Sequence, residues 1–349
     1  MKILRKAKYL YRTHSLDKHF KKELSNIKSK SAISSETLSY KQKKELSAYY
    51  GQFGLKVDCR WHEYLYAVTG EFNVKNIPEN LYHCCIEPLF TRGSEDFEDK
   101  AYMERLLPNV KMPENYFQRM NGYYYDGKGR MISENEMLKN LSKLDEKVII
   151  KPSVLTGGGR AVSLISGQNV DHRLLELYGK DFLIQRRILQ HPQYSRFNES
   201  SVNTEKIISF LYKGDVYILT SILRIGAPGA CTDTASGGRG YTIGIKENGQ
   251  LNDVGFNILG EKFHKDAAGK SFSSIQLESH QDICEIIKQA HAMLPKFGII
   301  SWDFAVDVDR EPILIEYNLN YPDVLIYQMN NGPLFGNLTD EILDSIKRG

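Results

Sequence analysis

Two carboxylates and one amide stand close together in the stretch I-I-S-W-D-F-A-V-D-V-D-R-E-P-I-L-I-E-Y-N. Apolar runs at 299–306 and 312–317 flank a polar turn, a pattern that predicts a β-hairpin. Glu316 and Asn318 are two residues apart and therefore point to one face of the second strand. The hairpin can bring Asp303, on the first strand, beside them. These hard oxygen ligands suit Mg²⁺, which keeps its other positions for water and phosphate. An ordinary surface hairpin with charged strand ends is the alternative.

Cationic and glycine-rich segments that could hold phosphate occur earlier in the chain. Lys151 ends the apolar strand V-I-I-K, and a glycine loop follows it at once. The loop contains Gly157, Gly158, Gly159 and Arg160. Glycine N–H groups can approach an oligophosphate without obstruction by a Cβ. No GKS or GKT follows, so the loop is not a Walker P-loop, and a simple turn between strands is the alternative.

Lys100 is a second candidate phosphate ligand. It lies in the first turn of a helix predicted over 96–107, with Asp96 or Asp99 as its cap. The helix dipole disfavours a lysine at this end, and a bound phosphate would remove that conflict. The alternative is an ordinary surface lysine.

Further strands and one helix position the remaining polar groups. Residues 182–190 predict a strand that leads into a connector, where an adenine could bond to backbone groups. Runs at 207–212 and 216–224 predict a second hairpin, which ends in Arg224. The spacing of apolar residues predicts an amphipathic helix over 281–297, directly before the strand of Asp303.

Composition indicates a globular protein with an uneven charge distribution. The 349 residues are 41% hydrophobic and 26% charged, with a net charge of +3. Residues 1–50, which predict helices broken near 31–35, hold 13 Lys and Arg against 4 Asp and Glu. No nucleic-acid-binding motif accompanies this charge, so we expect no nucleic-acid partner. A solvated helical face, or contact with an anionic membrane surface or an acidic partner, would explain the charge.

Cysteine usage and hydropathy indicate the cytoplasm. The five cysteines show no CxxC spacing, which favours reduced thiols. No apolar run is long enough to span a membrane, and the basic N-terminus lacks the apolar core of a signal peptide.

The order of these motifs resembles the ATP-grasp superfamily from about residue 96 to 345. The ordered set is D-K, I-K-P, the glycine loop, Q-R-R-I, R-I-G, W-D and E-Y-N. W-H-E-Y at 61–64 and S-V-N-T at 201–204 are similar to the sugar-transfer-associated ATP-grasp proteins of polysaccharide biosynthesis. The resemblance implies an α+β ATP-grasp fold, with two lobes that enclose the nucleotide. It implies an N-terminal helical cap at 1–95, an N-terminal ATP-grasp part at 96–190 and a C-terminal part with the metal site at 191–349.

The resemblance also implies roles for particular residues. The phosphates of ATP would be bound by Lys100, Lys151 and a flap of Gly157, Gly158, Gly159 and Arg160. The adenine hinge would comprise Gln185, Arg186, Arg187 and Ile188. The Mg²⁺ ligands would be Asp303, Glu316 and Asn318, and the catalytic residues would be Arg224 and Lys206. Two positions depart from the expected pattern, because Gln185 replaces a common glutamate and Lys206 replaces an arginine.

The implied activity is an ADP-forming carboxylate–amine ligase that uses ATP and Mg²⁺ and forms an acyl phosphate. It would join an amino acid or amine to a sugar acid, or an amino acid to an amino sugar, in capsule or O-antigen polysaccharide biosynthesis. A phosphotransferase acting on a sugar-like substrate, or a nucleotide-binding scaffold without turnover, would use the same residues. The expected partners are small-molecule carboxylates and amines, with possible peripheral contact to membrane-bound glycan machinery through the basic N-terminus.

Overall fold

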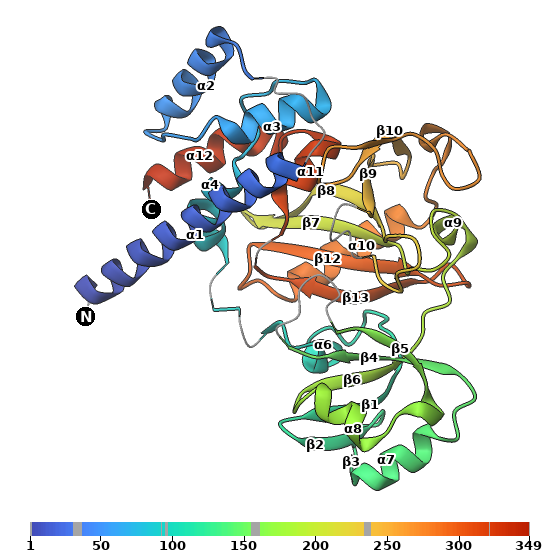
Figure 1. The fold of residues 1–349 in the computed structure, drawn as a ribbon. Coiled ribbons are helices and arrows are strands. Elements are labelled where there is room, and N and C mark those ends of the chain that lie inside the picture. The colour runs from blue at the N-terminus through green and yellow to red at the C-terminus, as the bar shows by residue number, and fades with distance from the viewer. Residues whose placement is uncertain are drawn as a thin grey trace.

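The computed structural model describes residues 2–30, 37–91, 93–94, 97–154, 161–233, 239–320 and 322–348. These residues form two antiparallel sheets with helices around them, so the predicted α+β class is confirmed (Figure 1). The α-helices are α1 (Lys2–Lys30), α2 (Tyr40–Gln52), α3 (Arg60–Thr69), α4 (Glu79–Leu81), α5 (Glu87–Phe90), α6 (Met103–Leu106), α7 (Glu134–Leu141), α8 (His172–Leu177), α9 (Pro192–Ser195), α10 (His280–Ala292), α11 (Val324–Asn331) and α12 (Thr339–Arg348).

A six-stranded sheet forms the lower part of the molecule in Figure 1, with the strand order β3-β2-β1-β6-β4-β5. Its strands are β1 (Asn115–Met120), β2 (Tyr123–Asp126), β3 (Met131–Ile132), β4 (Lys147–Pro152), β5 (Ser163–Ser166) and β6 (Phe182–Arg186). The apolar side chains of β4 and β6 pack with α7 and α8 in one core. Because β4 and β6 pair antiparallel, Lys151 near the end of β4 lies opposite Leu183 near the start of β6.

A seven-stranded sheet forms the centre, with the strand order β11-β10-β9-β8-β7-β12-β13. Its strands are β7 (Thr204–Tyr212), β8 (Asp215–Ile225), β9 (Tyr241–Ile245), β10 (Leu251–Phe256), β11 (Lys262–Phe263), β12 (Ile299–Val306) and β13 (Pro312–Asn318). The predicted hairpin of β12 and β13 is confirmed. Its turn contains Arg310 at φ +68°, and Asp307 Oδ1 accepts hydrogen bonds from the N–H groups of Asp309 and Glu311.

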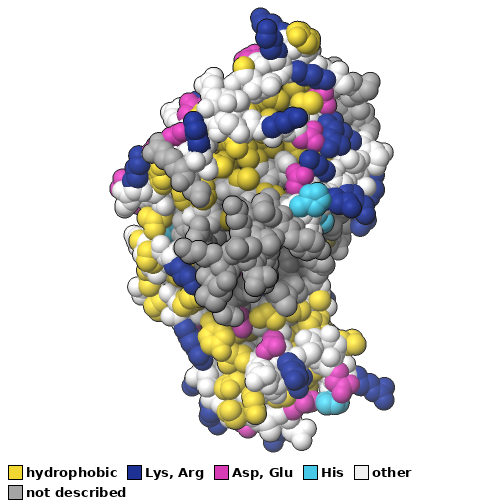
Figure 2. All heavy atoms as spheres, turned by 90° about the vertical axis from the view of Figure 1, so that its left-hand side faces the viewer, with side chains coloured by type: hydrophobic (Ala, Val, Ile, Leu, Met, Phe, Trp, Pro, Cys, Tyr) yellow, Lys and Arg dark blue, Asp and Glu magenta, His cyan; other side chains and the backbone are white. Residues whose placement is uncertain are grey.

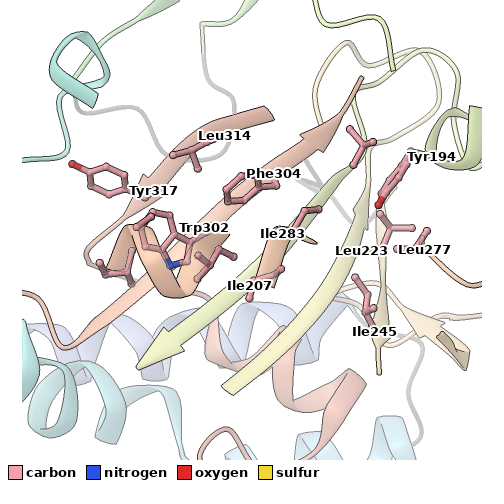
Figure 3. Packing of buried hydrophobic residues seen from close by; sticks show 14 of the residues in the cluster. Tyr194, Ile207, Leu223, Ile245, Leu277, Ile283, Trp302, Phe304, Leu314 and Tyr317 are labelled. Carbon is pink, nitrogen blue, oxygen red and sulfur yellow. The ribbon is translucent and has the colours of Figure 1, made fainter. Parts of the chain in front are cut away.

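One face of this sheet packs on α10 and forms the largest apolar cluster. Figure 3 shows Trp302 and Phe304 of β12 beside Ile207 of β7. The Trp302 indole N–H donates to Ser209 Oγ at 2.7 Å, and that oxygen lies 2.6 Å from Nδ1 of His291. The sequence makes His291 a candidate base, and we interpret it there as a solvated surface residue instead. That interpretation is wrong, because α10 turns the side chain inward, where it is fully buried.

The N-terminal helices pack on the opposite face, next to α11 and α12 (Figure 1). Helices are predicted in residues 1–50 and are present as α1 and α2, while the expected break near 31–35 lies outside the described residues. Ser39 and Gln42 begin α2 with a reciprocal capping box. Tyr50, which is fully buried, donates its hydroxyl to the carbonyl of Asn76 at 2.7 Å. These contacts attach α2 to the body of the protein.

Figure 2 shows the face on which these helices lie. Among the residues drawn in colour there, Lys and Arg side chains are interspersed with acidic and apolar ones. In the described part of the chain, no helix is both long and apolar enough to cross a membrane.

Candidate active site

Three neighbouring strands place one lysine and two carboxylates in a row. The strand register sets Asp303 of β12 opposite Lys206 of β7 on one side and opposite Glu316 of β13 on the other. A bulge follows directly after Asp303, so that Ile315 has no partner in the register. Asn318 pairs with Ser301 and shares the strand face of Glu316. The structure thus brings Asp303 and Glu316 together, with Asn318 two residues further along β13.

Each carboxylate has an ammonium partner. Lys206 Nζ contacts both oxygens of Asp303, and Lys100 Nζ lies 3.0 Å from Glu316 Oε2. Burial raises the pKa of Asp303 to about 6, with Lys206 opposing the shift and Glu316 adding to it. Burial also acts on Glu316, but Lys100 and then Lys206 hold the pKa of that carboxyl below its usual range. The two acids therefore repel each other and rely on nearby cations.

The oxygen donors and their charge fit a divalent cation. Two buried carboxylates that repel each other would be stabilised by a shared dication, which takes oxygen ligands. Among the described residues, no three His, Cys, Asp or Glu side chains gather as a ready metal cluster. A magnesium ion would therefore depend on Asp303 and Glu316 for charge, and on Asn318, water or phosphate for its other positions.

Lys100 and Lys151 lie near each other although they are 51 positions apart in the sequence. Asp99 caps a short 3₁₀ turn, Lys100–Tyr102, through a bond from the Ala101 N–H, and α6 follows. The predicted helix over 96–107 is therefore shorter than expected, and Asp96 lies outside the described residues. The N–H of Lys100 donates to the carbonyl of Ser153, directly after β4. Burial, and then repulsion by Lys100, lower the pKa of Lys151 to about 8.

A cavity of about 490 Å³ lies between the two sheets, beside these charges. It is lined by Lys100, Pro113, Ile149, Lys151, Val162, Leu164, Gln185, Arg186, Arg187, Ile188, Leu189, Gln190, Ser195, Glu199, Ser200, Ser201, Val202, Thr204, Cys231, Thr232, Asp233, Asp303, Val308, Ile315 and Glu316. The sequence prediction missed the apolar walls from Ile149, Leu164 and Ile315. Strand alternation could have found Ile149, which is two residues before Lys151 on β4.

The expected hinge connects the two sheets at one end of this cavity. Gln185 is 5% exposed, and its side chain donates to Asn115 Oδ1 at 2.8 Å. Arg186 is exposed and pairs with Glu114 on the surface at 2.9 Å. Gln190 then bonds to the carbonyl of Asn203 at 2.6 Å, which attaches the connector to the start of β7. Side chains at 185 and 186 are thus engaged by protein, so a contact with adenine at these two positions would be made by backbone groups.

Arg224 lies on β8 opposite Thr204 of β7, whose hydroxyl bonds to Asp233. The buried Nε of Arg224 has no hydrogen-bond partner among the described residues. Burial acts against its charge, but Asp233, Asp303 and then Asp323 raise its pKa above the usual value. Arg224 therefore stays charged with donor capacity available. The expected flap, with Gly157, Gly158, Gly159 and Arg160, lies outside the described residues.

Two antiparallel sheets that enclose a cavity with lysines at one end and a carboxylate pair beside them define an ATP-grasp fold. The family model described as sugar-transfer associated ATP-grasp matches residues 91–343, and the chain belongs to this family. No curated protein matches the chain.

Solved structures that are similar to this chain are distant from it in sequence. L-amino acid ligase from Bacillus licheniformis is 14% identical, with a TM-score of 0.42, over 72% of this chain and 48% of that one. Biotin carboxylase from Campylobacter jejuni is 11% identical, with a TM-score of 0.44, over 72% and 46%. N5-carboxyaminoimidazole ribonucleotide synthetase from Thermotoga maritima is 11% identical, with a TM-score of 0.37, over 65% and 43%. The matched part of this chain thus spans less than half of each of these structures.

Proposed function

We propose that the protein is an ADP-forming carboxylate–amine ligase that makes an amide through an acyl phosphate. The observation that carries this proposal is the arrangement of charge around the cavity between the sheets. Lys100, Lys151 and Glu316 line it together with Asp303. One strand away from Lys206, Arg224 has a buried donor with no partner in the described part of the chain. The lysines would bind the nucleotide phosphates, the two carboxylates would bind a metal ion, and Arg224 would donate to a developing oxyanion.

The roles of the residues follow from their charge. Lys100 and Lys151 would hold oxygens of the β- and γ-phosphates, and the flap of Gly157, Gly158, Gly159 and Arg160 would cover them. The backbone of 185–188 would bond to adenine. Asp303, Glu316 and Asn318 would hold Mg²⁺, which, when bound, neutralises charge on the phosphates. Lys206 would keep Asp303 ionised, as their close contact requires.

The reaction would take place in two steps. An oxygen of the carboxylate substrate attacks the γ-phosphorus, the bond to the β-phosphate oxygen breaks, and ADP leaves. The nitrogen of an amine then attacks the acyl carbon of the acyl phosphate, phosphate departs, and the nitrogen loses a proton. Arg224 would offer its planar guanidinium to the oxyanion that develops at the acyl group. The family's association with sugar transfer supports an amino acid or amine and a sugar acid, or an amino acid and an amino sugar, as substrates.

A trapping experiment tests the acyl phosphate. The protein is incubated with ATP, Mg²⁺, hydroxylamine and a panel of uronic acids and amino acids, and products are read by mass spectrometry. With the true carboxylate, a hydroxamate should accumulate together with ADP. Arg224→Ala should reduce its rate by about 10²–10³, the usual loss for one oxyanion donor. Arg130→Ala is the control. Arg130 is exposed, pairs with Asp126 and Glu136, and does not line the cavity, so its loss should leave the rate unchanged.

A different product would overturn the ligase proposal. A phosphotransferase would give ADP and a stable phosphorylated sugar, and no hydroxamate. That result would leave the nucleotide site in place but assign it to phosphoryl transfer alone.

A further inference from the structure

A second and larger cavity opens elsewhere on the seven-stranded sheet. This groove, of about 1470 Å³, shares no lining residue with the candidate nucleotide cavity. Its walls come from the end of α3, the first half of β8, the turn between β9 and β10, the first turns of α10 and the end of α11. One side presents His280 and Cys284 of α10. The groove is therefore wide enough for a small organic molecule to reach a thiol.

Three side chains form a relay that ends at this thiol. Cys284 Sγ lies 3.6 Å from His280 Nε2, and His280 Nδ1 lies 2.6 Å from Glu205 Oε2. The other oxygen of Glu205 accepts a hydrogen bond from the hydroxyl of Tyr194. Glu205 is fully buried and His280 is 1% exposed, whereas Cys284 is partly exposed. The carboxylate of the relay is thus hidden, while His280 and the more exposed Cys284 line the groove.

Secondary structure explains why these groups meet. His280 is the first residue of α10 and Cys284 is one turn later, so both side chains lie on one helix face. On β7, side chains alternate between the two faces of the sheet. Lys206 faces the candidate active site, so its neighbour Glu205 faces α10 on the other side. The strand that carries a candidate catalytic lysine therefore also supplies the acid of the relay.

The contacts of His280 place a proton acceptor beside the thiol. A buried carboxylate needs proton donors, and Glu205 obtains them from Tyr194 and from Nδ1 of His280. That bond leaves Nε2 of His280 facing the sulfur. Burial lowers the pKa of His280, but its contacts with Cys284 and Glu205 outweigh burial and raise it to about 10. An imidazolium beside a sulfur stabilises the thiolate, which is the reactive form of cysteine.

The other cysteines provide a contrast. Burial raises the pKa of Cys59 and of Cys85, and it raises that of Cys84 to about 12. Neither Cys59 nor Cys85 has a hydrogen bond to a histidine among the described residues. Cys59 and Cys85 are partly exposed like Cys284, so they are suitable internal references for its reactivity.

We propose that Cys284 is an activated thiol, whose proton the His280–Glu205 pair can accept, and that it takes low-molecular-weight disulfides that enter the groove. The Cys284 sulfur attacks one sulfur of the disulfide R–S–S–R. The S–S bond of the reagent breaks, a new S–S bond joins R–S to Cys284, and R–S⁻ leaves. The exchange needs no further oxidant, because the incoming disulfide is reduced to the released thiolate.

Labelling of the native protein tests this proposal. The full chain is treated at pH 7 with a limiting amount of the aromatic disulfide 5,5′-dithiobis(2-nitrobenzoate), and the modified peptides are quantified by mass spectrometry. An ordinary thiol with a pKa near 8.5 is only about 3% ionised at this pH, so a neighbouring base that accepts the proton can raise the population of the reactive thiolate by up to about 30-fold. Lower intrinsic nucleophilicity offsets part of this gain. We expect Cys284 to react about tenfold faster than Cys59 and Cys85.

Two variants separate activation from simple exposure. His280→Gln should slow labelling of Cys284 about tenfold and leave the rates of Cys59 and Cys85 unchanged. His264→Gln, which changes an exposed histidine, should leave all rates unchanged. Equal rates for Cys284, Cys59 and Cys85 in the unmodified protein would overturn the proposal, whether or not any variant folds. An unchanged Cys284 rate in folded His280→Gln would also overturn it.

Discussion

At the scale of single residues, Lys151 shows how far the candidate site depends on a ligand. It is 7% exposed, and burial together with Lys100 lowers its pKa to about 8. A buried ammonium is unfavourable without an anion nearby. Glu316, the nearest carboxylate that acts on it, is already paired with Lys100. No acid among residues 97–154, 161–233 and 239–320 forms an ion pair with Lys151, so a phosphate group would be a suitable partner for it.

Nucleotide binding should accordingly take up protons. A phosphate favours the charged lysine, so the pKa of Lys151 rises from about 8 when ATP binds. At pH 8.5 part of the free protein has a neutral Lys151, which gains a proton in the complex. Calorimetry with a non-hydrolysable ATP analogue, in two buffers of different ionisation enthalpy, should show this uptake. Lys151→Met should abolish it and weaken binding by about 1.5–3 kcal/mol.

Lys147→Met supplies the matched control, because Lys147 is an exposed lysine at the start of the same strand. It should keep both the affinity and the proton uptake. Equal affinity in Lys151→Met and the unmodified protein would make Lys151 a structural strand end.

At the scale of elements, a π-helical turn at Tyr82–Ile86 joins α4 to α5 and buries His83 between two acids. His83 Nε2 lies 3.3 Å from Glu79 and its Nδ1 lies 3.2 Å from Glu87. Glu79 in turn accepts hydrogen bonds from the first two N–H groups of α11, at 3.0 and 2.8 Å. Phe20 of α1 stacks on the imidazole, with ring centroids 4.6 Å apart. One histidine thus connects α1, α4, α5 and α11.

This arrangement predicts how stability varies with pH. Burial opposes the charge of His83, but Glu79 and Glu87 raise its pKa to about 9, above the ordinary value of 6.5. A raised pKa contributes stability that is complete below pH 6.5 and is lost as pH rises through 9. The free energy of unfolding should therefore fall by up to about 3 kcal/mol over this range, in excess of other titrations.

Chemical denaturation at several pH values checks this prediction. His83→Gln should remove this part of the pH dependence, while His264→Gln should retain it. The same slope in His83→Gln and in the unmodified protein would show that His83 is neutral in the folded state.

At the scale of the whole molecule, the N-terminal helices share a core with the seven-stranded sheet. Leu46 and Tyr50 of α2 belong to the same apolar cluster as Ile208 and Phe210 of β7, with Leu343 of α12 among them. We therefore expect the amide groups of α2 and of the sheet to lose protection against hydrogen exchange together when that core is weakened.

Leu343→Ala tests this coupling. Leu343 is fully buried, and truncation of a buried leucine costs about 2–5 kcal/mol. Hydrogen exchange followed by mass spectrometry should speed up in α2 and in β7 together. Lys347→Ala, an exposed change on the same helix, should alter stability by less than about 0.5 kcal/mol. Faster exchange in β7 with unchanged exchange in α2 would mean that the helices unfold as a separate unit.

Local patterns predicted much of this organisation. Apolar runs on both sides of a polar turn were enough to predict the hairpin of Asp303 and Glu316, and a further apolar run predicted the strand that carries Lys151. The contact between Lys206 and Asp303 was beyond such reasoning, because it depends on the register of strands 97 residues apart. The hydrogen bond from Gln185 to Asn115, which are 70 residues apart, could not be predicted for the same reason. The roles of Asp303, Glu316, Asn318, Lys206 and Arg224 stay predictions until the experiments above are done.

Long sequence separation also sets an order of events during synthesis. Tyr49 of α2 donates its hydroxyl to Asp340 of α12, a residue made 291 positions later. Glu79 accepts a hydrogen bond from the first residue of α11, which is synthesised 245 positions later. At roughly 5–20 residues per second, a ribosome needs about 15–60 s to cover the longer interval. For that time the apolar side of α2 has no partner from α12, and a chaperone that shields apolar helices could bind there before the C-terminal helices emerge.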